Sequence, residues 1–154
     1  MTGAVILGAA VLVAVAFGLF RRMRDGRFGG ASSRVMSPTV DAATPALDSV
    51  WREIAAALPQ ESLGERATLV QFSSAFCAPC RTTRVVLGDV AEREDGVRHL
   101  EIDAEQHLEL VRALDVRRTP TTLVLDARGH EVARAAGAPR RDQVLAALPV
   151  GAAS

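Results

Sequence analysis

The hydrophobic and polar positions divide the chain into an apolar start, a polar stretch and a longer region of short periodic segments. Residues 1–20 carry no charged side chain, and an Arg-rich cluster follows them at 21–27. A helix over 3–20 would span about 27 Å, close to the thickness of a bilayer core. We therefore predict a transmembrane anchor over 1–20 that contacts the lipid bilayer through 3–20.

The position of the basic cluster bears on the orientation of this anchor. A secretory signal peptide carries its positive charge before a shorter apolar run, whereas here the Arg cluster comes after the run. Residues 14–16 (Ala-Val-Ala) resemble a signal cleavage site, so a cleaved signal is the alternative. Because positive charge favours the cytoplasmic side, we predict a single-pass cell-membrane protein with a cytoplasmic C-terminal domain.

The remaining chain divides into a tether, one domain and a tail. Residues 21–45 are basic or polar, rich in Gly, Ser, Pro and Ala, and show no helical or strand period, so we predict a flexible tether. The compact domain is expected over 46–149, and 150–154 form the tail.

Periodic segments inside the domain predict alternating helices and strands. Helical spacing occurs at 47–58, 78–93, 107–114 and 140–148, and short β-branched or alternating runs occur at 67–74, 97–103, 121–126 and 131–137. The last two runs flank a Gly-containing turn and predict a hairpin. Strands that alternate with helices indicate parallel pairing through crossovers, and the hairpin adds an antiparallel strand at one edge. We predict an α/β fold: a mixed sheet with helices on both faces.

Composition narrows the possible chemistry. The formal net charge is zero, so nothing favours a nucleic-acid partner. The chain has only two cysteines, Cys77 and Cys80, which are too few for a disulfide framework. Both lie where the first strand of the domain meets the following helix.

A cysteine at the start of a helix has unusual chemistry. Unpaired N–H groups and the helix dipole stabilise a thiolate there, which makes it more reactive near neutral pH. Cys77 can then attack a partner's disulfide, and Cys80 can resolve the mixed disulfide. Pro79 fits early in the helix, where no N–H is needed. The alternatives are a metal half-site, a structural crosslink and a pair without a role. The scattered histidines offer no paired ligand spacing, so we expect no metal.

The motifs TLVQFSSAFCAPCR, VRRTPTTLVLDARG and AAGAP together resemble the thioredoxin family over about 46–148. The resemblance implies the thioredoxin-like fold, with Cys77 as exposed nucleophile and Cys80 as buried resolving thiol. It also implies that Pro120 is a cis-proline facing the sulfurs. The residues implied to contact substrate are Phe76, Ala78, Pro79, Thr119, Gly137 and Ala138.

Two departures from the family pattern concern proton transfer. Gln71 stands where the family carries a buried Asp that helps to deprotonate the resolving thiol, and His99 stands where it carries Lys. An amide cannot accept a proton at neutral pH. Gln71 and His99 are therefore candidate relay residues whose role the sequence leaves open.

These features predict a thiol–disulfide oxidoreductase that reduces protein disulfides and is tethered to the membrane. The dithiol carries two electrons itself, so we expect no cofactor. Expected partners are disulfide-containing proteins near the membrane and an upstream reductase. The alternatives are an extracytoplasmic thiol oxidase or cytochrome-maturation-type reductase, and a redox-inactive binding module with the same fold.

Overall fold

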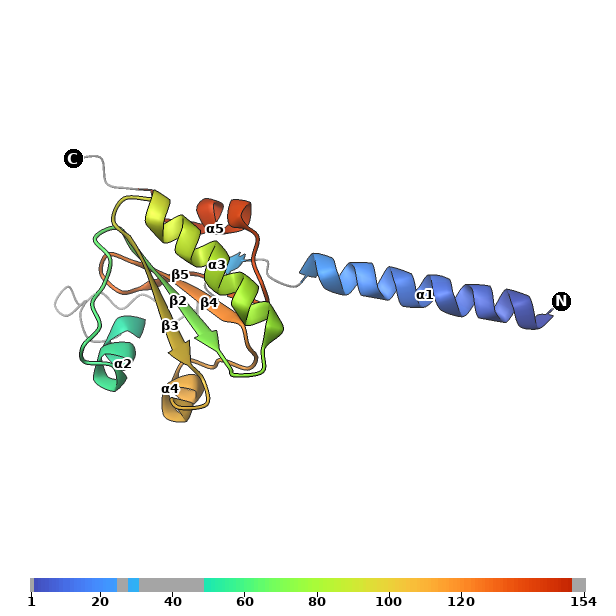
Figure 1. Ribbon diagram of the computed structural model, residues 1–154, viewed down its shortest axis with the longest axis horizontal. Helices are drawn as coiled ribbons and strands as arrows, with labels where there is room; N and C mark the ends of the chain where they lie inside the picture. Colours follow the sequence, from blue (N-terminus) through green and yellow to red (C-terminus); the bar gives the residue numbers. More distant parts are fainter. Residues whose placement is uncertain (1, 25–27, 31–48, 151–154) are drawn as a thin grey trace, which may run out of the picture.

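The computed structural model describes residues 2–24, 28–30 and 49–150, and describes side chains for 6–20 and 49–150. It shows a layered α/β domain and a separate N-terminal helix that extends away from it (Figure 1). The helices are α1 (Thr2–Arg24), α2 (Val50–Ala57), α3 (Ala78–Arg93), α4 (Leu108–Ala113) and α5 (Arg141–Ala147).

One mixed sheet forms the middle layer of the domain, in the order β1-β5-β4-β2-β3. Its strands are β1 (Phe28–Gly30), β2 (Ala67–Ser73), β3 (Val97–Asp103), β4 (Thr121–Asp126) and β5 (Glu131–Ala136). Every residue of β2 is buried, because neighbouring strands flank it and helices cover both of its faces. The predicted mixed sheet with helices on both faces is confirmed.

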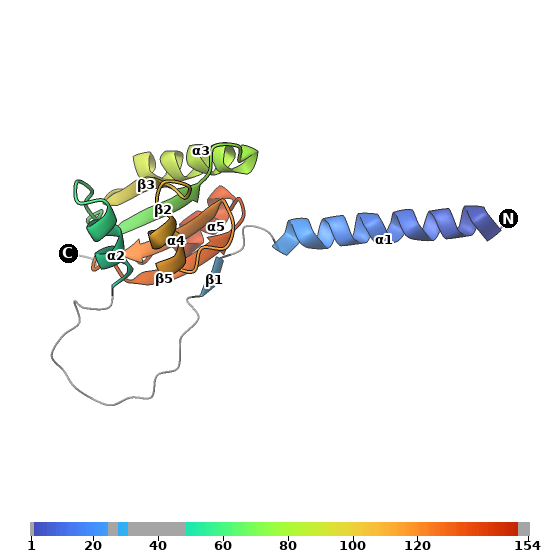
Figure 2. The same cartoon turned by 90° about the horizontal axis from the view of Figure 1, so that it is seen from below.

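Side chains that alternate along β2 enter two separate cores. One core lies beneath α2 and α4, and the other beneath α3 and α5 (Figures 1 and 2). The first includes Val70 and Phe72 of β2, whereas the second includes Ala67 and Leu69. This alternation follows from the two-residue period of a strand and fixes which face each β2 residue serves.

The direction of β4 differs from the prediction. β2 and β3 are parallel as expected, but β4 is antiparallel to β2 although a helix precedes it. Thr121, the first residue of β4, pairs with Phe72 near the end of β2, so the chain re-enters the sheet at the end at which β3 leaves it. The chain therefore does not return to the start of β3 before β4 begins, and β4 runs the opposite way.

Glycine shapes the hairpin between β4 and β5. Gly129 has a φ of 83°, and a Cβ at this position would lie 2.3 Å from the Cβ of Trp51. Its carbonyl accepts a hydrogen bond of 3.1 Å from the N–H of Trp51. The turn thus has the predicted glycine and also attaches the start of α2 to the sheet.

The segment predicted as a flexible tether, 21–45, contains regular structure in its described part. Helix α1 continues through Arg24, and Phe28–Gly30 pair antiparallel with β5. This corrects the expectation of a segment without helix or strand. Without β1, the outer edge of β5 would present unpaired backbone groups, and β1 pairs with them. The rest of the tether, and most of the predicted tail, lie outside the described residues.

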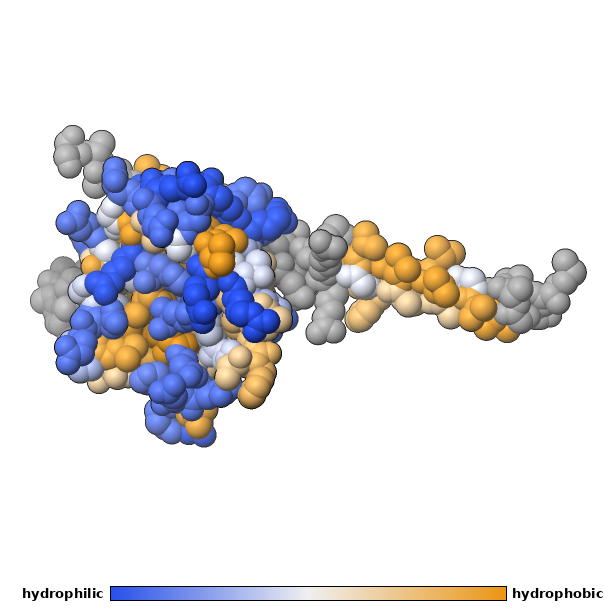
Figure 3. All heavy atoms as spheres, viewed as in Figure 1, coloured by the Kyte–Doolittle hydropathy of each residue, from blue (hydrophilic) through white to orange (hydrophobic). Residues whose placement is uncertain are grey.

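The described side chains of α1 are exposed and mostly apolar, and they form the hydrophobic rod in Figure 3. Among the residues whose side chains are described, no helix is both long enough and apolar enough to cross a membrane. The anchor remains a prediction from the sequence of residues 1–27.

Candidate redox site

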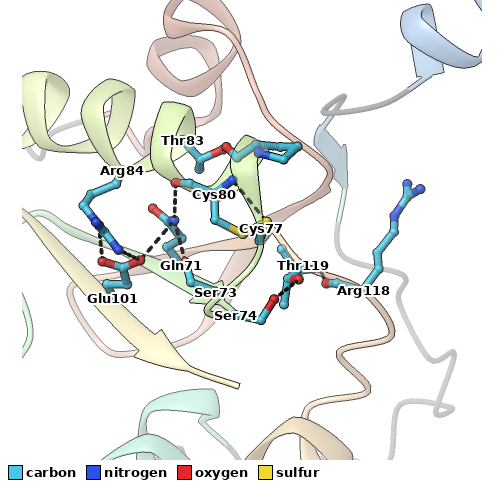
Figure 4. The surroundings of a disulfide bond; sticks show 12 residues. Gln71, Ser73, Ser74, Cys77, Cys80, Thr83, Arg84, Glu101, Arg118 and Thr119 are labelled. Carbon is cyan, nitrogen blue, oxygen red and sulfur yellow. Dashed lines mark hydrogen bonds and ion pairs between the residues drawn. A yellow bond between two sulfur atoms is a disulfide. The ribbon is translucent and has the colours of Figure 1, made fainter. Parts of the chain in front are cut away.

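The two cysteines lie at the first turn of α3, directly after the loop that follows β2 (Figure 4). Cys77 is the N-cap of α3 and is partly exposed, whereas Cys80 is only 2% exposed. Their sulfurs form a disulfide, and the Cys80 N–H donates a hydrogen bond of 3.1 Å to Cys77 Sγ. The same N–H also donates to the Cys77 carbonyl over 3.1 Å, so its hydrogen bond at the helix start is shared. In the reduced protein this donor would stabilise negative charge on the sulfur of Cys77.

Pro79 and Thr83 strengthen the same turn. Pro79 occupies the second helical position, where its missing N–H leaves no hydrogen bond unmade. The Thr83 hydroxyl donates to the Pro79 carbonyl over 3.1 Å, and Thr83 is fully buried. The hydrogen bond from Thr83 to Pro79 thus stabilises the first turn of α3, which carries both cysteines.

The loop before β4 lies against the disulfide. The Thr119–Pro120 peptide bond is cis, as the family resemblance implied. Ser74 Oγ and Thr119 Oγ1 are 3.0 Å apart and share a hydrogen bond, which joins the cysteine loop to the proline loop. The Gly137 N–H donates to the Pro120 carbonyl over 2.8 Å. These two bonds bring three chain segments together around the sulfurs.

The predicted contact residues differ in exposure. Phe76 is 98% exposed, and Ala78 and Pro79 are also exposed. Thr119, Gly137 and Ala138 are partly buried, and Pro120 is buried. An aromatic ring almost wholly in solvent beside a reactive disulfide is available to a partner. The contacts of these residues with substrate stay predictions.

Gln71 lies beneath the disulfide and is completely buried. Its Nε2 donates to Ser73 Oγ over 2.7 Å and to the Cys80 carbonyl over 2.9 Å. Two acceptors on one side fix the orientation of the amide, so Oε1 faces the other way. Gln71 thus holds the resolving cysteine by its backbone.

The two candidate relay residues, His99 and Gln71, are in contact. His99 Nε2 lies 3.2 Å from Gln71 Oε1, and because that oxygen only accepts, Nε2 carries the hydrogen. Burial holds the pKa of the His99 imidazole below its usual value, so the ring is neutral near pH 7. Whether this contact moves a proton remains a prediction.

Sequence reasoning missed an ion pair next to this network. Glu101 pairs with Arg84, with 2.8 Å between Oε1 and Nη2, and Oε1 lies 3.5 Å from Gln71 Nε2. The hydrogen bond from Arg84 holds the pKa of the Glu101 carboxyl below its usual value. Glu101 lies two residues after His99 and therefore faces the same side of β3, but only the pairing of β3 with β2 brings it to Gln71.

A cleft of about 380 Å³ opens between the disulfide and this ion pair. Its lining comes from the end of β2, the start of α3 and the end of β3: Ser73, Ser74, Ala75, Cys77, Cys80, Arg81, Arg84, Glu101 and Asp103. In Figure 4, Glu101 and Arg84 lie on one side of the disulfide, and Thr119 and Arg118 lie on the other. The disulfide therefore lies between the cleft with the Arg84–Glu101 ion pair and the proline loop.

Comparison with known proteins agrees with this geometry. Residues 60–151 match the family model described as a thioredoxin-like domain. The chain belongs to the thioredoxin-like family. It is 33% identical to thioredoxin H2-1 of Oryza sativa over 73 residues, which are 47% of this chain and 52% of that protein. It is 38% identical to human thioredoxin domain-containing protein 2 over 58 residues, 38% of this chain and 10% of that protein.

Solved thioredoxin structures show the same fold. A thioredoxin mutant from Halobacterium salinarum superposes with a TM-score of 0.51 at 24% identity, over 55% of this chain and 73% of that one. Thioredoxin NaTrxh from Nicotiana alata gives a TM-score of 0.50 at 24% identity, over 62% and 79%. The chain spans less than two thirds of the length of the first curated relatives. The thioredoxin-like membership and the Cys77–Cys80 pair together support thiol–disulfide chemistry.

Proposed function

We propose that this thioredoxin-like protein is a thiol–disulfide oxidoreductase that reduces disulfides of other proteins. The observation that carries the proposal is the pair of sulfurs at the start of α3. One sulfur is partly exposed and receives an N–H hydrogen bond, and the other is buried within bonding distance. A nucleophile needs access and stabilised negative charge, and a resolving thiol needs proximity and protection from solvent.

The reaction proceeds in two exchanges. In the reduced protein, the Cys77 thiolate attacks one sulfur of a substrate disulfide, which forms a mixed disulfide and releases the other substrate sulfur as a thiolate. The Cys80 thiolate then attacks Cys77 Sγ, which releases the second substrate thiolate and forms the Cys77–Cys80 disulfide. The two substrate thiolates take up two protons, and two electrons pass to the substrate. The dithiol supplies both electrons, so the step uses no cofactor, and an upstream reductase restores it.

Substrate recognition is assigned to the exposed surface around the proline loop. We assign to the backbone of Thr119 the pairing with an extended segment of the substrate, in the manner of strand addition. Phe76 offers an exposed apolar ring, and Gly137 lies next to Pro120 through its N–H. Such a surface favours unfolded or extended protein segments that carry a disulfide.

We also infer that residues 3–20 hold the domain at a membrane, with the domain in the cytoplasm. Support comes from the uncharged sequence of 1–20, the Arg cluster after it, and the exposed apolar side chains along α1. A tether raises the effective concentration of the domain for membrane-bound partners. Fractionation of cells that express the full chain should recover it with membranes after an alkaline wash. A topology reporter fused after Ser154 should show that the C-terminus lies in the cytoplasm.

Insulin reduction tests the oxidoreductase proposal. The full chain in a mild nonionic detergent, with dithiothreitol as reductant, should accelerate insulin precipitation, and Cys77→Ser should abolish the acceleration. Cys80→Ser should instead accumulate a mixed disulfide with insulin that reductant dissolves. Phe76→Ala should slow the reaction without changing the sulfur chemistry. Equal rates for the full chain and Cys77→Ser would overturn the proposal and favour a binding module.

A further inference from the structure

The strand β1 joins the domain at one particular end of the sheet. β4 begins with Thr121, directly after Pro120, at the end where β2 stops and the disulfide lies. β5 is antiparallel to β4 and β1 is antiparallel to β5, so β1 runs in the same direction as β4. The chain therefore enters β1 at the end of the sheet formed by Ser73, Thr121 and Ala136, which we call the redox edge.

The strand register places the start of β1 level with the buried residue beneath the disulfide. Phe28 pairs with Ala135, Ala135 pairs with Thr122, and Thr122 pairs with Gln71. These residues form one row across four strands, which covers about 14 Å. The row ends at Gln71, whose Nε2 donates to the Cys80 carbonyl over 2.9 Å. The segment that arrives from α1 and the two sulfurs thus lie at the same end of the domain.

The connection between α1 and β1 is short. If 3–20 span the bilayer core, 21–24 add about 6 Å of helix, close to the thickness of one headgroup layer. Only residues 25–27 separate α1 from β1, so the four Cα–Cα steps from Arg24 to Phe28 cover at most about 14 Å. Figures 1 and 2 show that α1 leaves the domain on the side toward which the arrow of β2 points. The redox edge is therefore the side of the domain that is nearest to the end of α1.

The opposite end of the sheet carries the turn between β4 and β5 and the start of α2. The Trp51 N–H donates to the Gly129 carbonyl in this turn over 3.1 Å. The six residues of β4 separate the two ends by about 20 Å. Figure 2 shows α2 at the end of the domain away from α1. Trp51, the only tryptophan of the chain, therefore marks the end far from the membrane.

We propose that β1 holds the domain with its redox edge toward the bilayer, so that the protein reduces disulfides of integral membrane proteins within about 15 Å of the bilayer surface. The proposal rests on the reductase activity and the membrane anchor proposed above, and it narrows the substrate class. A chain that was flexible from 25 to 49 would have a root-mean-square span of roughly 28 Å, and the site would face every direction. Phe76, 98% exposed in the loop beyond β2, would face a substrate segment at the surface.

Disulfides held at two heights above a bilayer test the proposal on the full chain in phosphatidylcholine vesicles. Each probe is a peptide with one internal disulfide, joined to a lipid headgroup through a proline spacer of about 10 Å or about 40 Å. The dithiol of the protein is reduced, excess reductant is removed, and its oxidation by each probe is followed by mass after acid quenching. Both probes are also measured in detergent, where height has no meaning. Dividing by those rates removes intrinsic differences in sulfur reactivity.

We expect the normalised rate with the short spacer to exceed that with the long spacer by about fivefold, because the short spacer keeps the disulfide where the redox edge is held. Gly29→Pro combined with Gly30→Pro should bring this ratio close to one. Successive N–H groups of a strand point to opposite sides, so one of the two prolines removes a donor that faces β5. Ser32→Pro combined with Ser33→Pro, just after β1, is the matched control and should leave the ratio unchanged.

Tryptophan quenching by a lipid with a nitroxide headgroup measures the orientation without relying on activity. The native chain reports from Trp51, and Phe76→Trp combined with Trp51→Phe reports from the redox edge. The tryptophan of Phe76→Trp should be quenched several-fold more than Trp51, because Trp51 lies about 20 Å farther from the bilayer. This comparison uses an intact β1, so it stands even if the Gly29 and Gly30 variant does not fold.

Equal rates for the two spacers in the native chain, or quenching of Trp51 as strong as that at position 76, would overturn the held orientation. Two controls identify which proposal has failed. Insulin reduction in detergent tests the oxidoreductase activity, and flotation of the chain with the vesicles tests the anchor. If insulin is reduced and the chain floats while the spacers react equally, only the orientation fails. If the chain does not float, the anchor and the orientation fail together, whereas the reductase proposal stands.

Discussion

Replacing Gln71 by aspartate should make the nucleophilic thiol less acidic. Gln71 is a neutral, completely buried side chain whose Nε2 lies 2.9 Å from the Cys80 carbonyl. An aspartate there would place a carboxylate beneath the two sulfurs. A nearby negative charge disfavours a thiolate and raises the pKa of the thiol. Conversely, we infer that the native amide makes the thiolate more stable here than in a thioredoxin that retains the acidic residue.

The expected magnitude follows from the surroundings of Gln71. Two unit charges about 7 Å apart at an effective dielectric constant of ~20 interact with about 2.4 kcal/mol, or roughly 1.7 pKa units. The new carboxyl will not be fully ionised, because it is buried and because Glu101 Oε1 lies 3.5 Å from the present Nε2. Both effects favour its neutral form. We therefore expect the pKa of the Cys77 thiol to rise by about one unit.

The assay is the ultraviolet absorbance of the Cys77 thiolate as a function of pH. Cys80→Ser in every protein leaves one thiol to titrate. Gln71→Asn is the matched control, because Asn and Asp have the same shape and differ in charge. Any change common to both comes from shortening the side chain and losing the bond to Cys80. Coincident titration midpoints for Gln71→Asp and Gln71→Asn would refute the electrostatic reasoning.

Three further predictions concern stability, measured as the free energy of unfolding in urea. Burial holds the pKa of His99 below its ordinary value of 6.5, so the unfolded chain binds the proton more readily than the folded chain. The free energy of unfolding should therefore decrease as the pH is lowered from about 7.5 to about 5.5. His99→Asn should flatten this slope, and an unchanged slope would contradict the assignment to His99. Arg84 lowers the pKa of Glu101, so the contribution of this pair is present above the ordinary carboxyl pKa of 4.5 and is lost as the pH falls through the folded value. Because the Arg84 side chain is 55% exposed, Arg84→Gln should cost less than about 1 kcal/mol at pH 7 and nothing in acid; a difference that persists in acid would count against the pair. The Thr122 hydroxyl is buried without a hydrogen-bond partner in the described part of the chain, so Thr122→Val should raise stability by about 1 kcal/mol, and a decrease would show that the hydroxyl has a partner.

The helices and strands of the domain could be predicted because their signals are local. The apolar spacing over 78–93 and the β-branched run after Arg66 coincide with α3 and β2. The position of Cys77 at a helix start followed from these two elements alone. The direction of β4 could not be predicted in this way, because it depends on the end at which the chain re-enters the sheet after α4.

The candidate site was only partly predictable for a similar reason. Cys77 and Cys80 are three residues apart, so one helical turn brings them together. Glu101 reaches Gln71 because β2 and β3 are parallel in a register that pairs these two residues. The register depends on how two strands pair, so the sequence of either strand alone does not determine it. The ion pair and the cleft therefore emerged only from the assembled sheet.

The short strand β1 has a consequence for how the protein is handled. It covers the outer side of β5 through Phe28–Gly30, in a segment that precedes the domain. A protease cut or a truncation downstream of Gly30 would leave β5 as an exposed edge, ready to pair with the same edge of another molecule. Fragments that begin at the domain should therefore self-associate as their concentration rises, whereas the full chain should not do so through this edge.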